Sequence, residues 1–492
     1  MAETVRLRIL PPGKVVEVAR GAPFEDTLFS LGIEFPCGGA GTCGGCRVRV
    51  LEGTVPPTQK MCEALTAAEI DAGWRLACQA RAESDAALEI EQWETVILAD
   101  DTPVPFDPVP GRLIAIDLGT TTIAAQLVDR KTGGVLATEA ALNPQAAWGA
   151  DVMTRIEHAL GGNTALTRAI REFVAAMCSR MGGADDVLLC GNTVMQHLYC
   201  GAPVHSLSRV PFEAALHGVQ QTGVTTFLPN LGGFVGSDIL AGIIATRLYA
   251  AEQLTALIDL GTNGEIVVGS KDRIVCASTA AGPAFEAGRI SMGMRACEGA
   301  ISRVSVQNRE LICHVIGNTR PRGICGSGLV DAVAAGLELG RVQPNGRLTN
   351  GLSALELAEP VALTQSDVRE LQLAKAAIAA GLRLLTARLG FTPADLDCVY
   401  LAGAFGNYLT VESARRIGLI EVDVSRVVPA GNTALRGTRI IGLTPSLRSF
   451  YTEELPERVE HVPLASDPAF QDTFVECLSL KREQHRPACE RS

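Results

Sequence analysis

Clusters of positive charge are missing from this chain of 492 residues. It has no run of five or more Lys or Arg residues, and its formal net charge is −11. Proteins that bind nucleic acid or an anionic membrane surface need clustered basic side chains. We therefore expect neither nucleic acid nor a membrane as a partner.

Long apolar runs are missing as well. A transmembrane helix requires about 18 uncharged apolar residues, and the run near Ile239–Ala245 already stops at Arg247. The first residues contain no apolar segment of the length found in signal peptides. Together these absences predict a cytoplasmic protein.

Cysteine, in contrast, is abundant, with fifteen residues, which is an odd number. In a chain without an export signal this number argues against a disulfide framework. Ten of the cysteines are scattered, and most lie beside apolar residues, so we expect them to be small core hydrophobes. These ten are Cys178, Cys190, Cys200, Cys276, Cys297, Cys313, Cys325, Cys398, Cys477 and Cys489.

Four cysteines near the start have the spacing of metal ligands: Cys37, Cys43, Cys46 and Cys78. Thiolates are soft ligands that suit iron–sulfur clusters and zinc. Glycines at positions 38, 39, 41, 44 and 45 permit a tight loop whose amide groups can face cluster sulfurs. The pattern predicts a plant-type 2Fe–2S cluster, with five rather than four residues in the first gap.

Two alternatives for this cysteine set remain open. Structural zinc usually needs two short Cys-x2-Cys turns, and only one is present. Cys62 could replace Cys78 as the fourth ligand. The segment resembles the 2Fe–2S ferredoxins over about 90 residues, and this resemblance favours the cluster over zinc.

The chain divides by composition into four parts. Residues 1–94 contain the cysteine motif, and residues 95–112 hold four prolines, which predicts a semi-rigid extended linker. Residues 113–480 alternate Gly-punctuated strands with helical stretches, which is typical of an α/β fold. The charged residues 481–492 are expected to form a frayed tail.

Several individual elements can also be predicted. Alternating apolar residues over Val5–Leu10 and again over Lys14–Val18 predict a hairpin, and Leu88–Ile90 is a further short strand. Ser366–Leu389 has apolar residues at helical spacing, with Ser366 as the expected N-cap and Gly390 as the stop signal.

One segment of the α/β part is repeated. Residues Ile114–Thr122 and Leu257–Gly264 each contain an apolar strand, an Asp-Leu-Gly-Thr turn and small polar residues, with Asp117 and Asp259 lying 142 residues apart. Such internal repetition predicts two related lobes.

The repeated turns have the chemistry of phosphate-binding sites. Backbone N–H groups of such a turn can face a phosphate, and hydroxyl groups add further donors. Two facing turns could clamp the β- and γ-phosphates of ATP, while Asp117 and Asp259 hold Mg²⁺ through water. The candidate binding residues are Gly119, Thr120, Thr121 and Thr122 in the first turn and Gly261, Thr262 and Asn263 in the second.

A third motif, Gly403, Ala404 and Phe405, follows an apolar strand that begins near Val399. There the backbone could pack flat against a ligand ring, although a strand-to-helix turn alone would give the same pattern. The order of the three motifs resembles the phosphate-1, phosphate-2 and adenosine motifs of the actin, sugar-kinase and heat-shock ATPase superfamily.

Other candidates lie between these motifs. Asp238 begins an apolar helical stretch and could orient the attacking water, or it could be only a helix N-cap. Gly326 and Ser327 begin another helix that could meet phosphate. Residues 191–193 and Glu286 are further polar candidates.

Taken together, the chain resembles the reductive activators of corrinoid proteins over nearly its whole length. The resemblance rests on the cysteine motif, the nucleotide motifs and matching stretches such as Gly282–Glu286 and Gly431–Leu435. It implies an N-terminal β-grasp ferredoxin-like domain followed by a two-lobed actin-like (ASKHA) ATPase of the ribonuclease H-like fold. Longer members have an extra segment between the two domains.

The resemblance also implies a function. ATP hydrolysis would drive the one-electron reduction of cob(II)alamin to cob(I)alamin on a methyl-carrier corrinoid protein, with the 2Fe–2S cluster as the immediate donor. The chain's other partners would be an upstream low-potential electron donor and a second copy of this chain, in a homodimer. Two alternatives are an ATP-gated electron donor to a non-corrinoid acceptor, and a redox-sensing ATPase that acts as a binding module. Activators of 2-hydroxyacyl dehydratases would not use this N-terminal cysteine set.

Overall fold

The computed structural model describes residues 3–10, 13–29, 33, 39, 41, 46–90, 100–149, 151–162, 164–261, 263–349 and 351–480. Cys37, Cys43, Thr262, the boundary expected at residue 94 and the tail expected at 481–492 lie outside these ranges. Within them, no helix combines the length and the apolar character that crossing a membrane would require. The chain forms two compact units, one of Met1–Asp238 with Thr438–Arg448 and one of Ile239–Gly437 with Ser449–Ser492.

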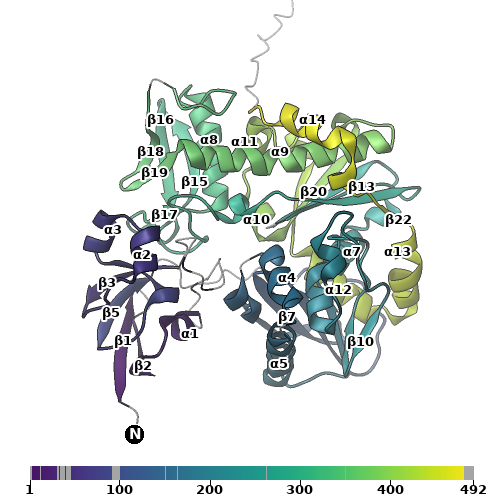
Figure 1. Ribbon diagram of the computed structural model, residues 1–492. Helices are drawn as coiled ribbons and strands as arrows, with labels where there is room; N and C mark the ends of the chain where they lie inside the picture. The colour runs from purple at the N-terminus through teal and green to yellow at the C-terminus, as the bar shows by residue number, and fades with distance from the viewer. Residues whose placement is uncertain are drawn as a thin grey trace, which may run out of the picture. The chain divides into compact units, whose positions relative to one another are not determined.

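The N-terminal segment forms a five-stranded sheet in the order β2-β1-β5-β3-β4 (Figure 1, purple). Strand β1 pairs antiparallel with β2 and parallel with the central strand β5, which confirms the predicted hairpin and the strand near residue 88. Every second residue of β1 is buried, because successive side chains of a strand point to opposite faces. The strands are β1 (Thr4–Leu10), β2 (Lys14–Ala19), β3 (Arg47–Glu52), β4 (Trp74–Leu76) and β5 (Ala86–Ile90), with helices α1 (Phe24–Phe29), α2 (Gln59–Ala64) and α3 (Ala67–Asp71).

The first α/β lobe contains a six-stranded sheet in the order β10-β11-β9-β6-β7-β8. Strand β6 pairs antiparallel with β7 and parallel with β9, and residues 113–116 of β6 are fully buried. The strands are β6 (Arg112–Leu118), β7 (Thr122–Asp129), β8 (Val135–Leu142), β9 (Asp186–Cys190), β10 (Gln220–Thr222) and β11 (Thr225–Phe227). The helices include α4 (Val152–Leu160), α5 (Ala165–Arg180) and α6 (Thr193–Cys200). Helix α7 (Ser237–Thr246) begins in this unit and continues into the second from Ile239 on.

The second lobe has a six-stranded sheet in the order β21-β20-β12-β13-β14-β22. Its strands are β12 (Thr255–Leu260), β13 (Gly264–Gly269), β14 (Ile274–Thr279), β20 (Cys398–Ala402), β21 (Val427–Gly431) and β22 (Val459–His461). Its helices include α8 (Gly326–Glu338), α9 (Gln365–Arg388), α10 (Gly403–Tyr408), α11 (Val411–Ile417), α13 (Leu455–Glu457) and α14 (Pro468–Cys477). Helix α12 (Thr433–Leu443) begins in this unit and continues into the first from Thr438 on. Smaller sheets are formed by β15 (Ala300–Gln307), β16 (Glu310–Val315) and β17 (Gly323–Ile324), and by β18 (Ala354–Ala358) and β19 (Val361–Thr364).

The two lobes share one strand topology. In each, the strand that carries the repeated Asp pairs antiparallel with the next strand in sequence, which pairs antiparallel with the third. On its other side the same strand pairs in parallel with the fourth strand. The fourth strand in turn pairs in parallel with β11, the sixth strand in sequence, in the first lobe and with β21, the fifth strand, in the second lobe. The two lobes predicted from the repeated turn are therefore confirmed.

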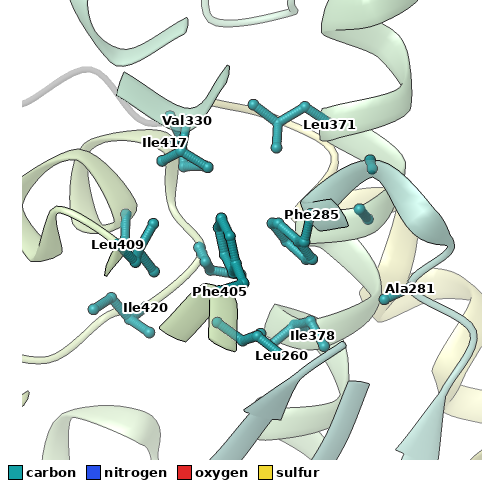
Figure 2. Close-up of a cluster of buried hydrophobic side chains, with 14 of the residues drawn as sticks. Leu260, Ala281, Phe285, Val330, Leu371, Ile378, Phe405, Leu409, Ile417 and Ile420 are labelled. Carbon is teal, nitrogen blue, oxygen red and sulfur yellow. The ribbon is translucent and has the colours of Figure 1, made fainter. Parts of the chain in front are cut away.

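The N-cap of helix α9 lies two residues earlier than expected. Thr364, not Ser366, is the N-cap, because its side chain accepts a hydrogen bond from Asp367 N while the Asp367 carboxylate accepts one from Thr364 N. The helix ends before Gly390, whose φ of +86° lies in the left-handed region, as predicted. Figure 2 shows Leu371 and Ile378 of α9 in the core of this lobe, near Phe285 and Phe405.

The described part of the proline-rich segment, residues 100–111, contains no helix or strand and lies along the first lobe. The buried guanidinium of Arg439 on α12 donates hydrogen bonds to Asp100 O (2.6 Å), Thr102 O (2.5 Å) and the Gln126 side chain (3.0 Å). Further along, Asp107 N donates to Leu443 O at 2.7 Å. These contacts tie the segment to the lobe.

We expect Arg439→Leu to release this segment. Loss of the guanidinium leaves buried carbonyl groups without a donor, which should lower the free energy of unfolding by at least about 2 kcal/mol. Thermal unfolding and limited proteolysis of residues 100–111 measure both effects. Arg168→Leu, a change at an exposed arginine of the same unit, should alter neither; equal stability of the two variants would contradict the anchoring role.

Candidate functional site

Strand pairing brings together two of the four predicted cluster ligands. Cys46 immediately precedes β3 and Cys78 follows β4, and these strands pair antiparallel with Arg47 opposite Leu76. One step beyond the ladder, Ala77 N donates to Cys46 O at 2.8 Å. Residues 32 apart in sequence are thus held side by side at one end of the sheet.

The two sulfurs share a hydrogen-bonding environment suited to thiolates. A hydrogen bond with Cys46 lowers the pKa of Cys78 to about 7; partial burial opposes this shift, while the Gln79 amide and the Gly41 N–H support it. Gln79 is itself held by a 2.8 Å hydrogen bond from Nε2 to Gly39 O. Because N–H donors aimed at sulfur are what an iron–sulfur cluster needs, the described half of the ligand set fits such a cluster.

The remaining cysteines of this region are placed differently. Cys37 and Cys43 lie outside the described residues, so their assignment stays a prediction. Cys62 is exposed within α2, whereas Cys46 is buried and Cys78 half-buried. The pairing of Cys46 with Cys78 supports Cys78 over Cys62 as the fourth ligand.

The first Asp-Gly turn joins β6 to β7. Gly119 N donates to Thr122 O at 3.1 Å and closes the turn. The hydroxyl of Thr120 accepts a hydrogen bond from Asn192 Nδ2 at 2.8 Å, which brings residues 191–193 to the turn, as the sequence suggested. Asp117 lies opposite Cys190 of β9 in the parallel ladder.

Asp238 belongs to the same group of residues. Ser237 N and Asp238 N donate to Gly191 O at 3.0 and 3.4 Å, so the first turn of α7 is fixed to the end of β9. Burial raises the pKa of the Cys190 thiol, and the charges of Asp117 and Asp238 add to this shift, which places both carboxylates near that thiol. Asp238 is the second residue of α7 rather than a residue preceding it, which weakens the N-cap alternative.

The second Asp-Gly turn joins β12 to β13 in the other unit. Gly261 N donates to Asn263 O at 3.1 Å, the counterpart of the bond in the first turn; Thr262 lies outside the described residues. Asp259 lies opposite Ala402 of β20. The next residue, Gly403, has a φ of +82°, and a Cβ there would lie 2.6 Å from Asp259 Oδ1. The third motif is thereby packed directly against the second carboxylate.

Other predicted residues take part in packing. Phe405 is nearly buried and stacks on Phe285, with ring centroids 4.9 Å apart (Figure 2). At this motif the nucleotide would therefore contact the backbone of Gly403 and Ala404 rather than the Phe405 ring. At the start of α8, a Cβ on Gly326 would lie 1.8 Å from Phe285 O, and the Ser327 hydroxyl donates to Ser302 O. Glu286 is exposed.

Two polar residues that touch the first turn were missed from the sequence. Asn143 Nδ2 donates to Gly119 O at 2.8 Å, and Arg155 Nη2 donates to Thr120 O at 2.7 Å. Asn143 directly follows β8, where a polar residue could have been suspected. Arg155 gives no such signal, because an arginine on an amphipathic helix usually faces solvent.

Three family models match consecutive segments of this chain. Family models described as a 2Fe–2S iron–sulfur cluster binding domain, the RACo middle region and the C-terminal ASKHA domain of RACo match residues 7–83, 113–251 and 253–490. The corrinoid activation enzyme RamQ of Eubacterium limosum is 34% identical over 412 residues, which cover 74% of this chain and 69% of RamQ. This chain belongs to the family of reductive activators of corrinoid proteins.

Two further relatives agree with this assignment. The [Co(II) methylated amine-specific corrinoid protein] reductase of Methanosarcina barkeri is 28% identical to the activator described here, with 74% of this chain and 76% of that protein covered. A solved reductive activator for corrinoid, iron–sulfur protein has a TM-score of 0.66 and 27% identity, and covers 98% of this chain and 99% of its own. The expected fold class, a ferredoxin-like domain followed by an ASKHA ATPase, is confirmed, and so are the 2Fe–2S cluster and ATP as cofactors.

We expect Cys78→Ser to remove the cluster from this activator. The variant loses a thiolate that the ladder holds beside Cys46, so the visible absorbance and most of the bound iron should disappear. Cys62→Ser is the matched control and should retain both. The reverse pattern would make Cys62 the fourth ligand.

Gly403→Ala should impair ATP hydrolysis beyond its effect on stability. Alanine at a positive φ costs about 1–2 kcal/mol, and here its Cβ also displaces the Asp259 carboxylate. Gly390→Ala is the matched control, because Gly390 has a similar φ of +86° but no heavy atom within 4 Å of the added Cβ. Both variants should lose comparable stability, and only Gly403→Ala should lower kcat, by about tenfold or more.

Proposed function

We propose that this chain uses ATP hydrolysis at its two Asp-Gly turns to drive the one-electron reduction of cob(II)alamin to cob(I)alamin on a methyl-carrier corrinoid protein. The observation that supports this most directly is that one chain combines the Cys46–Cys78 pair with two lobes that share the order and direction of five strands. In each lobe an Asp-Gly turn follows the strand that carries the repeated Asp. A redox site and a nucleotide site in one protein are what an energy-coupled electron transfer requires.

In this proposal the cluster is held by Cys37, Cys43, Cys46 and Cys78. A plant-type 2Fe–2S cluster, when bound, supplies one electron at about −400 mV. The chain's own contribution is to hold Cys46 and Cys78 at the end of the β3–β4 ladder and to aim N–H donors at the Cys78 sulfur. The cluster would receive its electron from a separate low-potential donor protein.

Each of the two turns would contribute groups to nucleotide binding. Gly119 and Thr120–Thr122 bind phosphate from the first lobe, and Gly261–Asn263 bind from the second. Asp117 and Asp259 would orient the water ligands of Mg²⁺, since each carboxylate lies at a strand end beside a turn. Asp238, fixed near Asp117 by the contacts of α7 with Gly191, would position the attacking water.

ATP is needed because cob(I)alamin formation is a more reducing couple than the donor. Moving one electron against a potential difference requires about 2.3 kcal/mol per 100 mV. Closure of the two lobes on ATP could supply this free energy by changing the corrinoid's cobalt ligation or by trapping the reduced partner. A homodimer and a cytoplasmic location remain predictions.

The test uses the full-length, cluster-loaded, reduced protein mixed with a panel of corrinoid proteins that carry cob(II)alamin. We expect cob(I)alamin absorbance to appear only with Mg-ATP, and Asp259→Asn to slow it roughly 10- to 100-fold. Asp272→Asn, at an exposed turn of the same unit, is the control and should react like the wild type.

Two outcomes would contradict the proposal. Cobalamin reduction at the same rate without nucleotide would make ATP irrelevant to the electron transfer. Absence of cob(I)alamin across the panel, despite a reducible cluster and a working ATPase, would point to a non-corrinoid acceptor.

A further inference from the structure

Each backbone carbonyl of the first phosphate turn is held by a donor from the protein. The four bonds link Gly119 O to Asn143 Nδ2 (2.8 Å), Thr120 O to Arg155 Nη2 (2.7 Å), Thr121 O to Asn143 N (2.8 Å) and Thr122 O to Gly119 N (3.1 Å). The turn is thus fixed by its oxygen atoms, and two of the three donor residues lie outside it.

This arrangement decides where the amide groups point. In a trans peptide the C=O of one residue and the N–H of the next point in opposite directions. With the carbonyls of residues 119–121 directed at Asn143 and Arg155, the N–H groups of Thr120, Thr121 and Thr122 are directed away from them. Successive N–H groups that point to the same side form an anion-binding concavity.

Arg155 itself is a buried cation, and no carboxylate among the described residues binds it. Its side chain is 0% exposed, and its other partners are Gly149 O (2.9 Å), Gln145 Oε1 (3.4 Å) and Met195 Sδ (3.5 Å). Among the described residues none of these partners is charged. Burial lowers the pKa of Arg155 to about 9, and the charge of Asp151 opposes this shift.

The Asp151 carboxylate is committed elsewhere. As the N-cap of α4 it accepts hydrogen bonds from Thr154 N at 2.9 Å and from the Thr154 hydroxyl. Burying a charge is unfavourable unless an opposite charge or hydrogen bonds compensate for it. Carbonyl and amide oxygens compensate for Arg155 only in part, and its guanidinium reaches directly to the turn that is expected to hold phosphate.

We propose that Arg155 is a positioning residue of the first phosphate turn and that its buried charge is balanced by the polyphosphate of the nucleotide. This inference rests on the proposed ATP site. Arg155 acts through the Thr120 carbonyl, orienting the N–H groups, and through its positive potential behind the turn. A purely structural arginine would instead stabilise the lobe equally with and without nucleotide.

Two substitutions at Arg155 separate charge from hydrogen bonding. Arg155→Gln removes the charge but keeps an amide donor for Thr120 O. Arg155→Lys keeps the positive charge, but on an ammonium group whose hydrogen-bond geometry differs from that of the guanidinium. We expect Arg155→Gln to raise the Kd of Mg-ADP by about tenfold or more, since hydrogen bonds from charged groups are the stronger ones. Arg155→Lys should lie closer to the wild type.

The measurements are Mg-ADP titration by calorimetry and thermal unfolding of the nucleotide-free full-length chain. Arg171→Gln is the matched control, because Arg171 also donates to a backbone carbonyl, Tyr199 O at 2.6 Å, within the same unit. It should leave the Kd of Mg-ADP unchanged, whatever its effect on stability.

The remaining outcomes would overturn the inference. Lower thermal stability of Arg155→Gln with an unchanged Kd would make Arg155 structural, and equal losses of affinity in the Gln and Lys variants would exclude charge balance. A wild-type chain that does not bind Mg-ADP would instead refute the proposed ATP site, so the two failures are distinguishable.

Discussion

Parallel pairing at two strand ends is the constraint on which the nucleotide chemistry of this activator depends. Strand β6 brings Asp117 beside Cys190, and strand β12 brings Asp259 beside Ala402. In both lobes the next residue along the partner strand is a glycine, Gly191 or Gly403. A Cβ at Gly191 would lie 2.6 Å from Leu118 O, and one at Gly403 would lie 3.1 Å from Leu260 O. The close approach of the ends of β6 and β12 to the segments that follow β9 and β20 therefore requires glycine.

The two lobes share this plan but stabilise their turns differently. The first turn is held from behind by the polar side chains of Asn143 and Arg155, and a helix carrying Asp238 is fixed beside it. In the second lobe Gly403 packs against Asp259, and the aromatic pair Phe285–Phe405 forms the core beneath (Figure 2). The two lobes thus share the order of five strands, while the side chains around each turn differ.

The ferredoxin-like domain follows the same physical logic on a smaller scale. A ladder between β3 and β4 holds Cys46 and Cys78 together, as the ladders of the lobes hold carboxylates beside glycines. Backbone hydrogen bonds of the ladders fix where the cysteines and carboxylates lie, so these side chains need no further contacts to hold them there. Strand ends hold functional side chains more precisely than loops do, which suits both cluster binding and phosphate binding.

The sequence by itself determined the class of chemistry, because ligand type and local spacing are encoded in short stretches. The cysteine spacing predicted the cluster, and the repeated Asp-Leu-Gly-Thr turn predicted two lobes whose shared strand order the structure confirms. The hairpin and α9 were also predictable, although the N-cap of α9 was misplaced because Thr364 forms a capping box that outcompetes Ser366. Only the tertiary structure showed that Phe405 lies in the core and that Arg155 and Asn143 hold the first turn. Those contacts join residues separated by up to 120 positions, and no local pattern records them, since they depend on how helices pack onto a finished sheet.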